Sequence, residues 1–265
     1  MVVLVSIKPL ALITEPLLSA DDELSILLPP VSSPHDYSLK ASDMSRLSEA
    51  DLVVWMGPRL ERFLSKPLAR IDSKKQVLAN PESVKNIENG INEHDLGDPH
   101  YWLDPQAVEG MTVIIGEKLM ELDPENQFQI RQRVDNQVMR LQELHQSLQR
   151  QFFPIKERSF VVYHRAYDHL VTTYGLNQIG AITLTPEQPA GARHLVELQA
   201  QLKAAPARCL FVEASHDSAA ARTIARQLHL EVALLDPLGV AESIRTYPDL
   251  MLQLANDMVS CLSPQ

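Results

Sequence analysis

Short runs of Val, Ile and Leu that alternate with longer amphipathic stretches most constrain the fold of this chain. A run that is apolar at consecutive positions is buried on both faces, as strands are in a parallel sheet covered by helices. The alternation with helical stretches favours parallel connections and predicts the α/β class. The runs fall four in each half of the chain, at residues 2–6, 25–29, 52–56, 75–79, 160–164, 178–182, 209–213 and 231–235.

A long helical stretch separates the two sets of runs. It begins near Asp104, a plausible helix N-cap, with Pro105 in the first turn and Pro124 as an interruption. Beyond Pro124 we expect a helix of about seven turns, roughly 40 Å long at the usual rise per residue. A helix of this length can join two lobes, although it can also pack within one domain. Its apolar stripe consists of Ile130, Val134, Val138, Leu141, Leu144 and Leu148.

Charge argues against one class of partner, and hydropathy argues against a membrane-spanning segment. The formal net charge is −10 and no Lys/Arg cluster occurs, so we expect no binding to nucleic acid. No apolar stretch approaches the roughly 20 residues that span a bilayer. The opening "MVVLVSIKPLALI" lacks a basic start and a small-residue cleavage site, so we interpret it as a first buried strand rather than a leader.

Histidines and carboxylates occur where the predicted strands end. His35 follows the run 25–29, His164 ends 160–164, and His100 precedes a helix. Ligands of open α/β sheets bind at the carboxyl ends of the strands. Three imidazoles and a carboxylate would suit a divalent transition metal, above all zinc. Spacing alone does not show that they converge, and a single histidine in such a setting is more often a surface or core residue than a ligand. Glu213 ends the run 209–213, and Asp236 directly follows the run 231–235.

Enzyme signatures are absent from the sequence. No GxSxG, GxGxxG or GxxxxGK[ST] pattern occurs, and the two cysteines lie in apolar surroundings. Glu213 could serve as the general base of a zinc-dependent hydrolase, which therefore remains an alternative. The cysteines, Cys209 and Cys261, are either two buried thiols or a bridge. A bridge would close a loop of 261 − 209 = 52 residues, worth about 4 kcal/mol in the chain-entropy description.

Several segments resemble one known family, in the same order along the chain. They look like the periplasmic zinc-binding proteins of ABC importers, the ZnuA family within cluster A-I (cluster 9) of the solute-binding proteins. The resemblance covers nearly the whole chain, and residues 35–68 are its most specific part. The segments are "SIKPLALI", "HDYSLKASDMSRLSEADLVVWMGPRLERFLSKPL", "DPHYWLDPQ", "FVVYHRAYDHLVTTYGL" and "LLDPLG".

The resemblance implies a fold. It implies two Rossmann-like lobes, each a mostly parallel four-stranded sheet flanked by helices, joined by one long rigid helix. We expect an N-terminal lobe at residues 1–123, the linking helix at 124–152 and a C-terminal lobe at 153–265. Cys209 and Cys261 match the pair that is disulfide-bonded in zinc-binding members, which implies a periplasmic location with the leader already removed.

The resemblance also implies a function without catalysis. His35, His100 and His164 match the three zinc-binding histidines, with Asp236 or water as fourth ligand. Manganese-binding relatives carry a glutamate at the third position, so His164 favours zinc. We therefore expect a monomeric protein that captures Zn²⁺ between the lobes and delivers it to a membrane permease. A manganese- or iron-binding protein, an adhesin and a metal chaperone of the same fold remain alternatives.

This chain departs from the family pattern at three places. The loop before His100 contains only His94, where many zinc-binding members have a long His-rich stretch. Pro34 stands where some members place a glutamate that could bind the metal. Arg165 and His216 replace the commoner residues beside His164 and Glu213. Arg165 therefore brings positive charge close to the expected metal, and Arg165 and Glu213 are candidates for contacts with the metal ligands.

Overall fold

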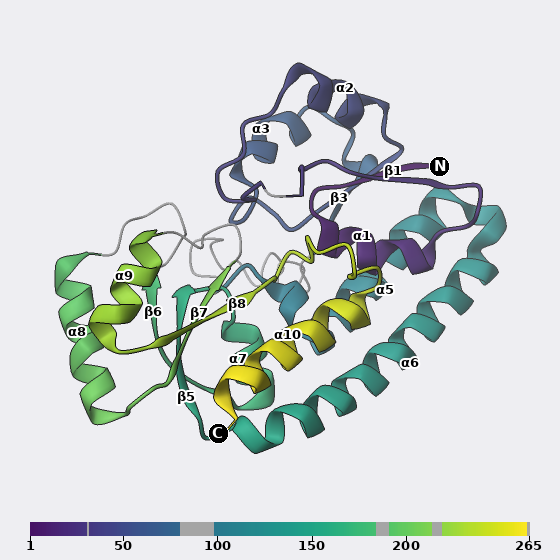
Figure 1. Cartoon of the computed structure of the whole chain (residues 1–265). Coiled ribbons are helices and arrows are strands. Elements are labelled where there is room, and N and C mark those ends of the chain that lie inside the picture. The colour runs from purple at the N-terminus through teal and green to yellow at the C-terminus, as the bar shows by residue number, and fades with distance from the viewer. Residues whose placement is uncertain (31, 80–97, 184–190, 214–218, 264–265) are drawn as a thin grey trace, which may run out of the picture. The chain divides into compact units, whose positions relative to one another are not determined.

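The computed structural model describes residues 1–265 apart from residue 31 and residues 80–97, 184–190, 214–218 and 264–265 (Figure 1). The chain divides into two compact units. Unit 1 comprises Met1–His145 and Leu238–Tyr247, and unit 2 comprises Gln146–Pro237 and Pro248–Gln265. The boundaries expected after residues 123 and 152 stay a prediction.

Unit 1 contains a four-stranded sheet in the order β2-β1-β3-β4, with every neighbouring pair parallel. The two central strands are buried along most of their length, which explains their unbroken apolar runs. The edge strand β2 is shorter at its carboxyl end than expected, although the N–H groups of Leu27 and Leu28 still bond to carbonyls of the first strand segment. The strands are β1 (Val2–Val5), β2 (Glu23–Ile26), β3 (Leu52–Trp55) and β4 (Gln76–Leu78).

Helix α5 of unit 1 begins at the signals that the sequence indicates. Asp104 is the N-cap of α5, as predicted, and its Oδ1 accepts the N–H of Gln106 at 3.0 Å. Pro105 occupies the first helical position, where its missing N–H is not needed. The elements are α1 (Lys8–Thr14), the 3-10 turn η1 (Glu15–Leu17), α2 (Ala41–Glu49), the 3-10 turn η2 (Arg62–Leu64), α3 (Ser65–Leu68), the 3-10 turn η5 (Tyr101–Leu103) and α5 (Pro105–Leu122).

The long helix expected from the sequence is α6 (Gln127–Phe152), and its chain passes from unit 1 to unit 2 after His145. Most of the predicted apolar stripe is buried, from Ile130 to Leu148. Gly116 of α5 lets Val134 of α6 approach closely, because a Cβ at position 116 would lie 2.3 Å from Val134 Cγ2. None of the described helices is both long and apolar enough to cross a membrane.

Unit 2 repeats the architecture with a second parallel sheet, in the order β6-β5-β7-β8. Two parallel four-stranded sheets flanked by helices confirm the predicted fold class. The strands are β5 (Ser159–His164), β6 (Asn177–Thr183), β7 (Cys209–Glu213) and β8 (Glu231–Leu235). The helices are α7 (Asp168–Tyr174), α8 (Ala192–Ala204), α9 (Ala219–Leu228) and α10 (Tyr247–Leu262), with the last turns of α6.

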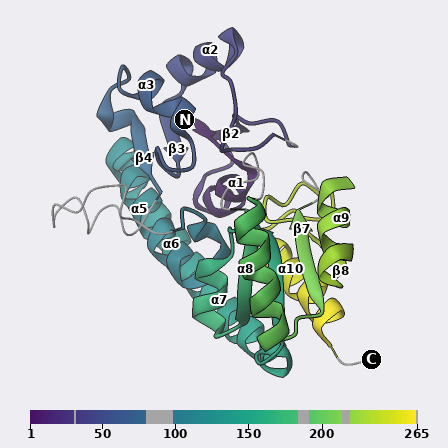
Figure 2. The same cartoon turned by 90° about the vertical axis from the view of Figure 1, so that its left-hand side faces the viewer.

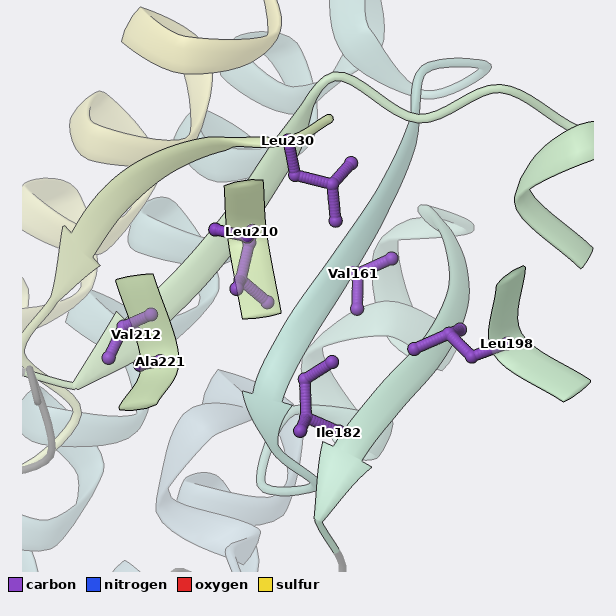
Figure 3. Close-up of a cluster of buried hydrophobic side chains, with 8 residues drawn as sticks. Val161, Ile182, Leu198, Leu210, Val212, Ala221 and Leu230 are labelled. Carbon is purple, nitrogen blue, oxygen red and sulfur yellow. The ribbon is translucent and has the colours of Figure 1, made fainter. Parts of the chain in front are cut away.

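Helices α8 and α9 cover one face of this sheet (Figure 2). In the close-up of Figure 3, Ala221 of α9 lies beside Val212 of β7, and Leu198 of α8 lies on the side of Val161 and Ile182. Alternate residues of a strand point to opposite faces. Cys209 therefore points away from this cluster and forms the predicted disulfide with Cys261 of α10.

After β8 the chain returns to unit 1 for ten residues before α10 continues unit 2. Within unit 1, Lys8 Nζ donates to the carbonyl oxygen of Ala241 at 3.3 Å. Tyr247 is fully buried, and its hydroxyl donates to the carbonyl oxygen of Trp102 at 2.8 Å. The returning segment, Leu238–Tyr247, is thus held to the start of α1 and to the turn before α5.

Candidate metal centre

His35 lies beyond the carboxyl end of β2 in unit 1, in the loop that leads to α2. The preceding Pro34 is buried, and the imidazole of His35 is partly exposed. The His35 N–H donates to Ser33 Oγ at 3.2 Å, which turns the chain locally. A proline with a fixed φ and a local side-chain bond together limit the directions in which this imidazole can point.

His100 immediately precedes η5 and is 4% exposed. Asp98 holds it twice, because Asp98 Oδ1 accepts the His100 backbone N–H at 3.0 Å and also contacts the ring atom Nδ1. A carboxylate can only accept, so Nδ1 carries the proton and Nε2 carries the lone pair. The indole of Trp102 packs edge-on against the ring, with centroids 5.0 Å apart. Its position and tautomer are therefore both determined by neighbours.

The structure brings His35 and His100 together, although 65 residues separate them in the sequence. Their Nε2 atoms lie 3.3 Å apart and their ring centroids 5.3 Å apart. With its lone pair on Nε2, the neutral ring of His100 can accept a hydrogen bond from Nε2 of His35 or bind a metal ion at that atom. Neutral imidazole nitrogens are the ligands that zinc prefers, together with thiolates and carboxylates. The chemistry of this pair therefore fits a divalent transition metal.

His164 is the last residue of β5 in unit 2 and is 3% exposed. Its Nδ1 lies 2.8 Å from Oε1 of Glu213, the last residue of the neighbouring strand β7. Since Glu213 is also buried, the contact fixes Nδ1 as the protonated nitrogen of the ring. The arrangement matches that of His100, because in each case a carboxylate contacts Nδ1 and orients the ring.

Asp236 directly follows β8 in unit 2. Leu235, which precedes it, pairs with Glu213 in the parallel register. Asp236 therefore lies at the same end of the sheet as His164 and Glu213, where the strands have their carboxyl ends. Arg165 instead turns to solvent, with a side chain 55% exposed, and its Nε donates to Asp168 Oδ2 at 2.8 Å. Nothing in the structure explains why an arginine occupies this position.

Asp98 is a functional candidate that the sequence analysis missed. The signal available was an acidic residue two positions before a histidine, at the entry to a helix. That spacing lets one carboxylate bond both to the backbone and to the ring of His100. His94 and His216, which the sequence analysis singled out, lie outside the described residues.

Glu61 of unit 1 was also missed, and it is fully buried. Its Oε2 accepts the N–H of Met56 at 2.7 Å and that of Gly57 at 3.3 Å, where φ of Gly57 is +112° and favours glycine. Burial raises the pKa of Glu61 to about 7, and the bonds from the two backbone N–H groups oppose the shift only in part. Glu61 thus joins the end of β3 to the turn that follows it.

The chain is similar in sequence and in fold to proteins of one known family. Residues 3–261 match the family described as "Zinc-uptake complex component A periplasmic", ZnuA. The chain is 30% identical to the high-affinity zinc uptake system protein ZnuA of Yersinia pestis over 98% of this chain and 91% of that protein. A crystal structure of ZnuA has a TM-score of 0.83 at 27% identity, covering 99% of both chains.

A second solved structure, a ZnuA deletion mutant with zinc bound, has a TM-score of 0.83 at 26% identity and covers 100% of this chain and 99% of that one. The family match spans almost the whole sequence, and the likeness of fold extends over both lobes. A zinc-uptake family and this fold are consistent with imidazole side chains that follow or end the strands. This chain belongs to the ZnuA family of zinc-uptake components.

Proposed function

We propose that this protein captures Zn²⁺ in the periplasm with the Nε2 atoms of His35, His100 and His164, and delivers it to the permease of an ABC importer. Asp236 or water completes the coordination. The observation that carries the proposal is the 3.3 Å approach of two imidazole nitrogens whose geometry is set by buried neighbours. The family's description as a zinc-uptake component supplies the direction of transport.

Two of the three imidazoles are each in contact with a carboxylate, which favours zinc over a harder metal ion. Asp98 and Glu213 bond to Nδ1 of His100 and His164, an arrangement that orients a ligating imidazole and raises its basicity. A manganese site would call for more oxygen ligands than three histidines allow. Because the ligands must be unprotonated, zinc affinity falls as the pH falls.

The same contact argues for binding without catalysis. A general base needs access to water beside the metal. Glu213 is instead 7% exposed and engaged with His164 at 2.8 Å. We therefore assign Glu213 to the orientation of His164, and Zn²⁺ is the cargo rather than a catalyst. The protein acts as a monomer, which sedimentation analysis with and without zinc tests directly.

Calorimetric titration of the metal-free protein with Zn²⁺ and with Mn²⁺ tests the ligand set. We expect one tight zinc site per chain and much weaker manganese binding. Replacement of His35, His100 or His164 by alanine should weaken zinc binding by more than about 100-fold, beyond the usual loss for an outer-shell partner. His194→Ala removes an exposed histidine of unit 2 and is the matched control. A site that survives His164→Ala unweakened would exclude His164 as a ligand.

Delivery is tested with the importer reconstituted in vesicles. Zinc-loaded protein should stimulate both ATP hydrolysis and zinc accumulation. The metal-free protein and the loaded His194→Ala control separate an effect of zinc from an effect of the protein surface. Zinc accumulation at the same rate without the protein would contradict the proposed role.

A further inference from the structure

A hollow of about 900 Å³ in unit 1 carries an unusual concentration of positive charge for a chain with a net charge of −10. Arg59, Arg62 and Lys66 line it, and all three side chains are exposed. Within the part of the chain that the structure describes, no acidic side chain forms an ion pair with any of them. The charge is therefore available to a ligand.

The three cations come from one short stretch of backbone. Arg59 lies in the turn after β3, Arg62 begins η2, and Lys66 lies in α3. Residues three or four apart in helical turns lie on the same side, so these like charges repel one another. Asp36 is the one acidic residue among the described lining residues, which leaves a formal charge of 3 − 1 = +2 with His35 neutral.

Polar and aromatic groups complete the lining. Ser65 also lines the hollow, and its buried Oγ has no hydrogen-bond partner among the described residues. The rings of Tyr37 and Phe63 meet edge to face with centroids 5.4 Å apart. The Tyr37 hydroxyl is tied to Asp43 Oδ2 at 2.9 Å, so this ring is held in place. Guanidinium groups beside an aromatic ring that is held in place suit the binding of an oxyanion.

We propose that this hollow binds a small multivalent oxyanion, of the phosphate or polycarboxylate class. Two arginines can each offer paired N–H groups to such an anion, and Lys66 adds a point charge. A monovalent anion would neutralise only half of the formal charge. Binding of a multivalent anion should also relieve the repulsion between Arg62 and Lys66.

The hollow also bears on zinc, because His35 is part of its lining. This second step rests on the proposed zinc site. A bound Zn²⁺ would add positive charge beside the hollow and strengthen anion binding, and by linkage the anion would strengthen zinc binding by the same factor. The anion would thus be a co-ligand of zinc capture, and zinc would be held more firmly where the anion is plentiful.

Isothermal titration of the zinc-free protein with inorganic phosphate and with citrate tests the hollow alone. Acetate in the same buffer is the monovalent control. We expect saturable 1:1 binding of phosphate or citrate, and whichever binds identifies the source of the oxyanion. The double change Arg62→Gln with Lys66→Gln should weaken it at least 10-fold. Arg131→Gln with Arg140→Gln removes the same charge from exposed positions of α6 and should leave it intact.

Absence of saturable binding would overturn the proposal, as would an equal loss in both double variants, which would reflect net charge alone. Retained 1:1 zinc binding shows that each variant is folded. The zinc linkage is measured by repeating the phosphate or citrate titration on zinc-loaded protein. Anion binding that persists without any change on zinc addition would leave the hollow established and refute the linkage. A failed zinc site would show separately, in the zinc titration itself.

Discussion

The Tyr247 hydroxyl donates to the Trp102 carbonyl at 2.8 Å, joining residues 145 positions apart. Trp102 also packs against His100, so the bond holds the turn that carries a proposed zinc ligand. The bond comes from the segment that returns to unit 1 after β8. A hydrogen bond from a distant part of the sequence thus holds the turn beside His100.

Tyr247→Phe should lower the free energy of unfolding by about 1 kcal/mol, the usual net worth of a buried hydrogen bond. Amide exchange should accelerate at Leu103 and Asp104, whose N–H groups close the turn after His100. Urea denaturation and hydrogen exchange of the zinc-free protein measure the two effects. Tyr163→Phe, at a half-buried position of β5, is the control. Unchanged exchange at Leu103 would show that the bond does not hold the turn.

Asp98→Asn and Glu213→Gln should each weaken zinc binding by about 10- to 100-fold. Each amide keeps the size of the carboxylate but loses the charge that fixes Nδ1 as the protonated nitrogen of His100 or His164. Competition titration with a chromogenic chelator measures the change. Glu231→Gln removes a largely exposed carboxylate of unit 2 and should have no effect. Equal affinity in Asp98→Asn and the control would remove Asp98 from the metal centre.

Glu61 should make unit 1 less stable as the pH rises. Its pKa of about 7 in the folded state exceeds the ordinary glutamate value of 4.5, so between these values the folded state holds a proton that the unfolded state has lost. Its stabilising contribution is complete below about pH 4.5 and is lost by pH 7, a change of up to about 3 kcal/mol. Glu61→Gln should resemble the wild type at pH 5 and be more stable at pH 8, as judged by urea denaturation without zinc. A constant difference across this range would contradict the prediction.

Gly116→Ala should destabilise the packing of α5 against α6 by about 1–3 kcal/mol, the usual cost of overpacking. The new Cβ would meet Val134 Cγ2, and a buried β-branched side chain has little freedom to move. Adding Val134→Ala should remove the clash, so the double variant should lose less than the two single losses together. Gly191→Ala, where nothing lies within 4 Å of the added Cβ, is the control. Additive losses would indicate that α5 and α6 shift apart freely.

Local signals predicted the elements of the fold well. The runs at residues 209–213 and 231–235 coincide with β7 and β8, and the Asp104 cap formed as predicted. These features depend on burial and hydrogen bonding within a few residues, which the sequence displays directly. The disulfide between Cys209 and Cys261 followed from the resemblance, since apolar context alone left two free thiols open.

Features that depend on distant neighbours were not readable in the same way. Asp98 gains its role from the orientation of the His100 ring, and Glu61 from complete burial behind a turn, neither of which has a periodic signature. The return of Leu238–Tyr247 to unit 1 also lacked a signal, because a short connection after a strand can dock on either unit. The hollow around Arg62 arises from side chains that the sequence shows only as scattered charges.

The return of Leu238–Tyr247 means that neither unit is built from one continuous stretch of chain. Ribosomes and export channels release a polypeptide in order, and domains ordinarily fold one after another as they emerge. Here the first unit cannot be complete until Tyr247 has emerged, and the second cannot be complete until the helix that carries Cys261 has emerged. The residues after Pro237 complete both units, so a truncation at that point would leave each unit without part of its structure.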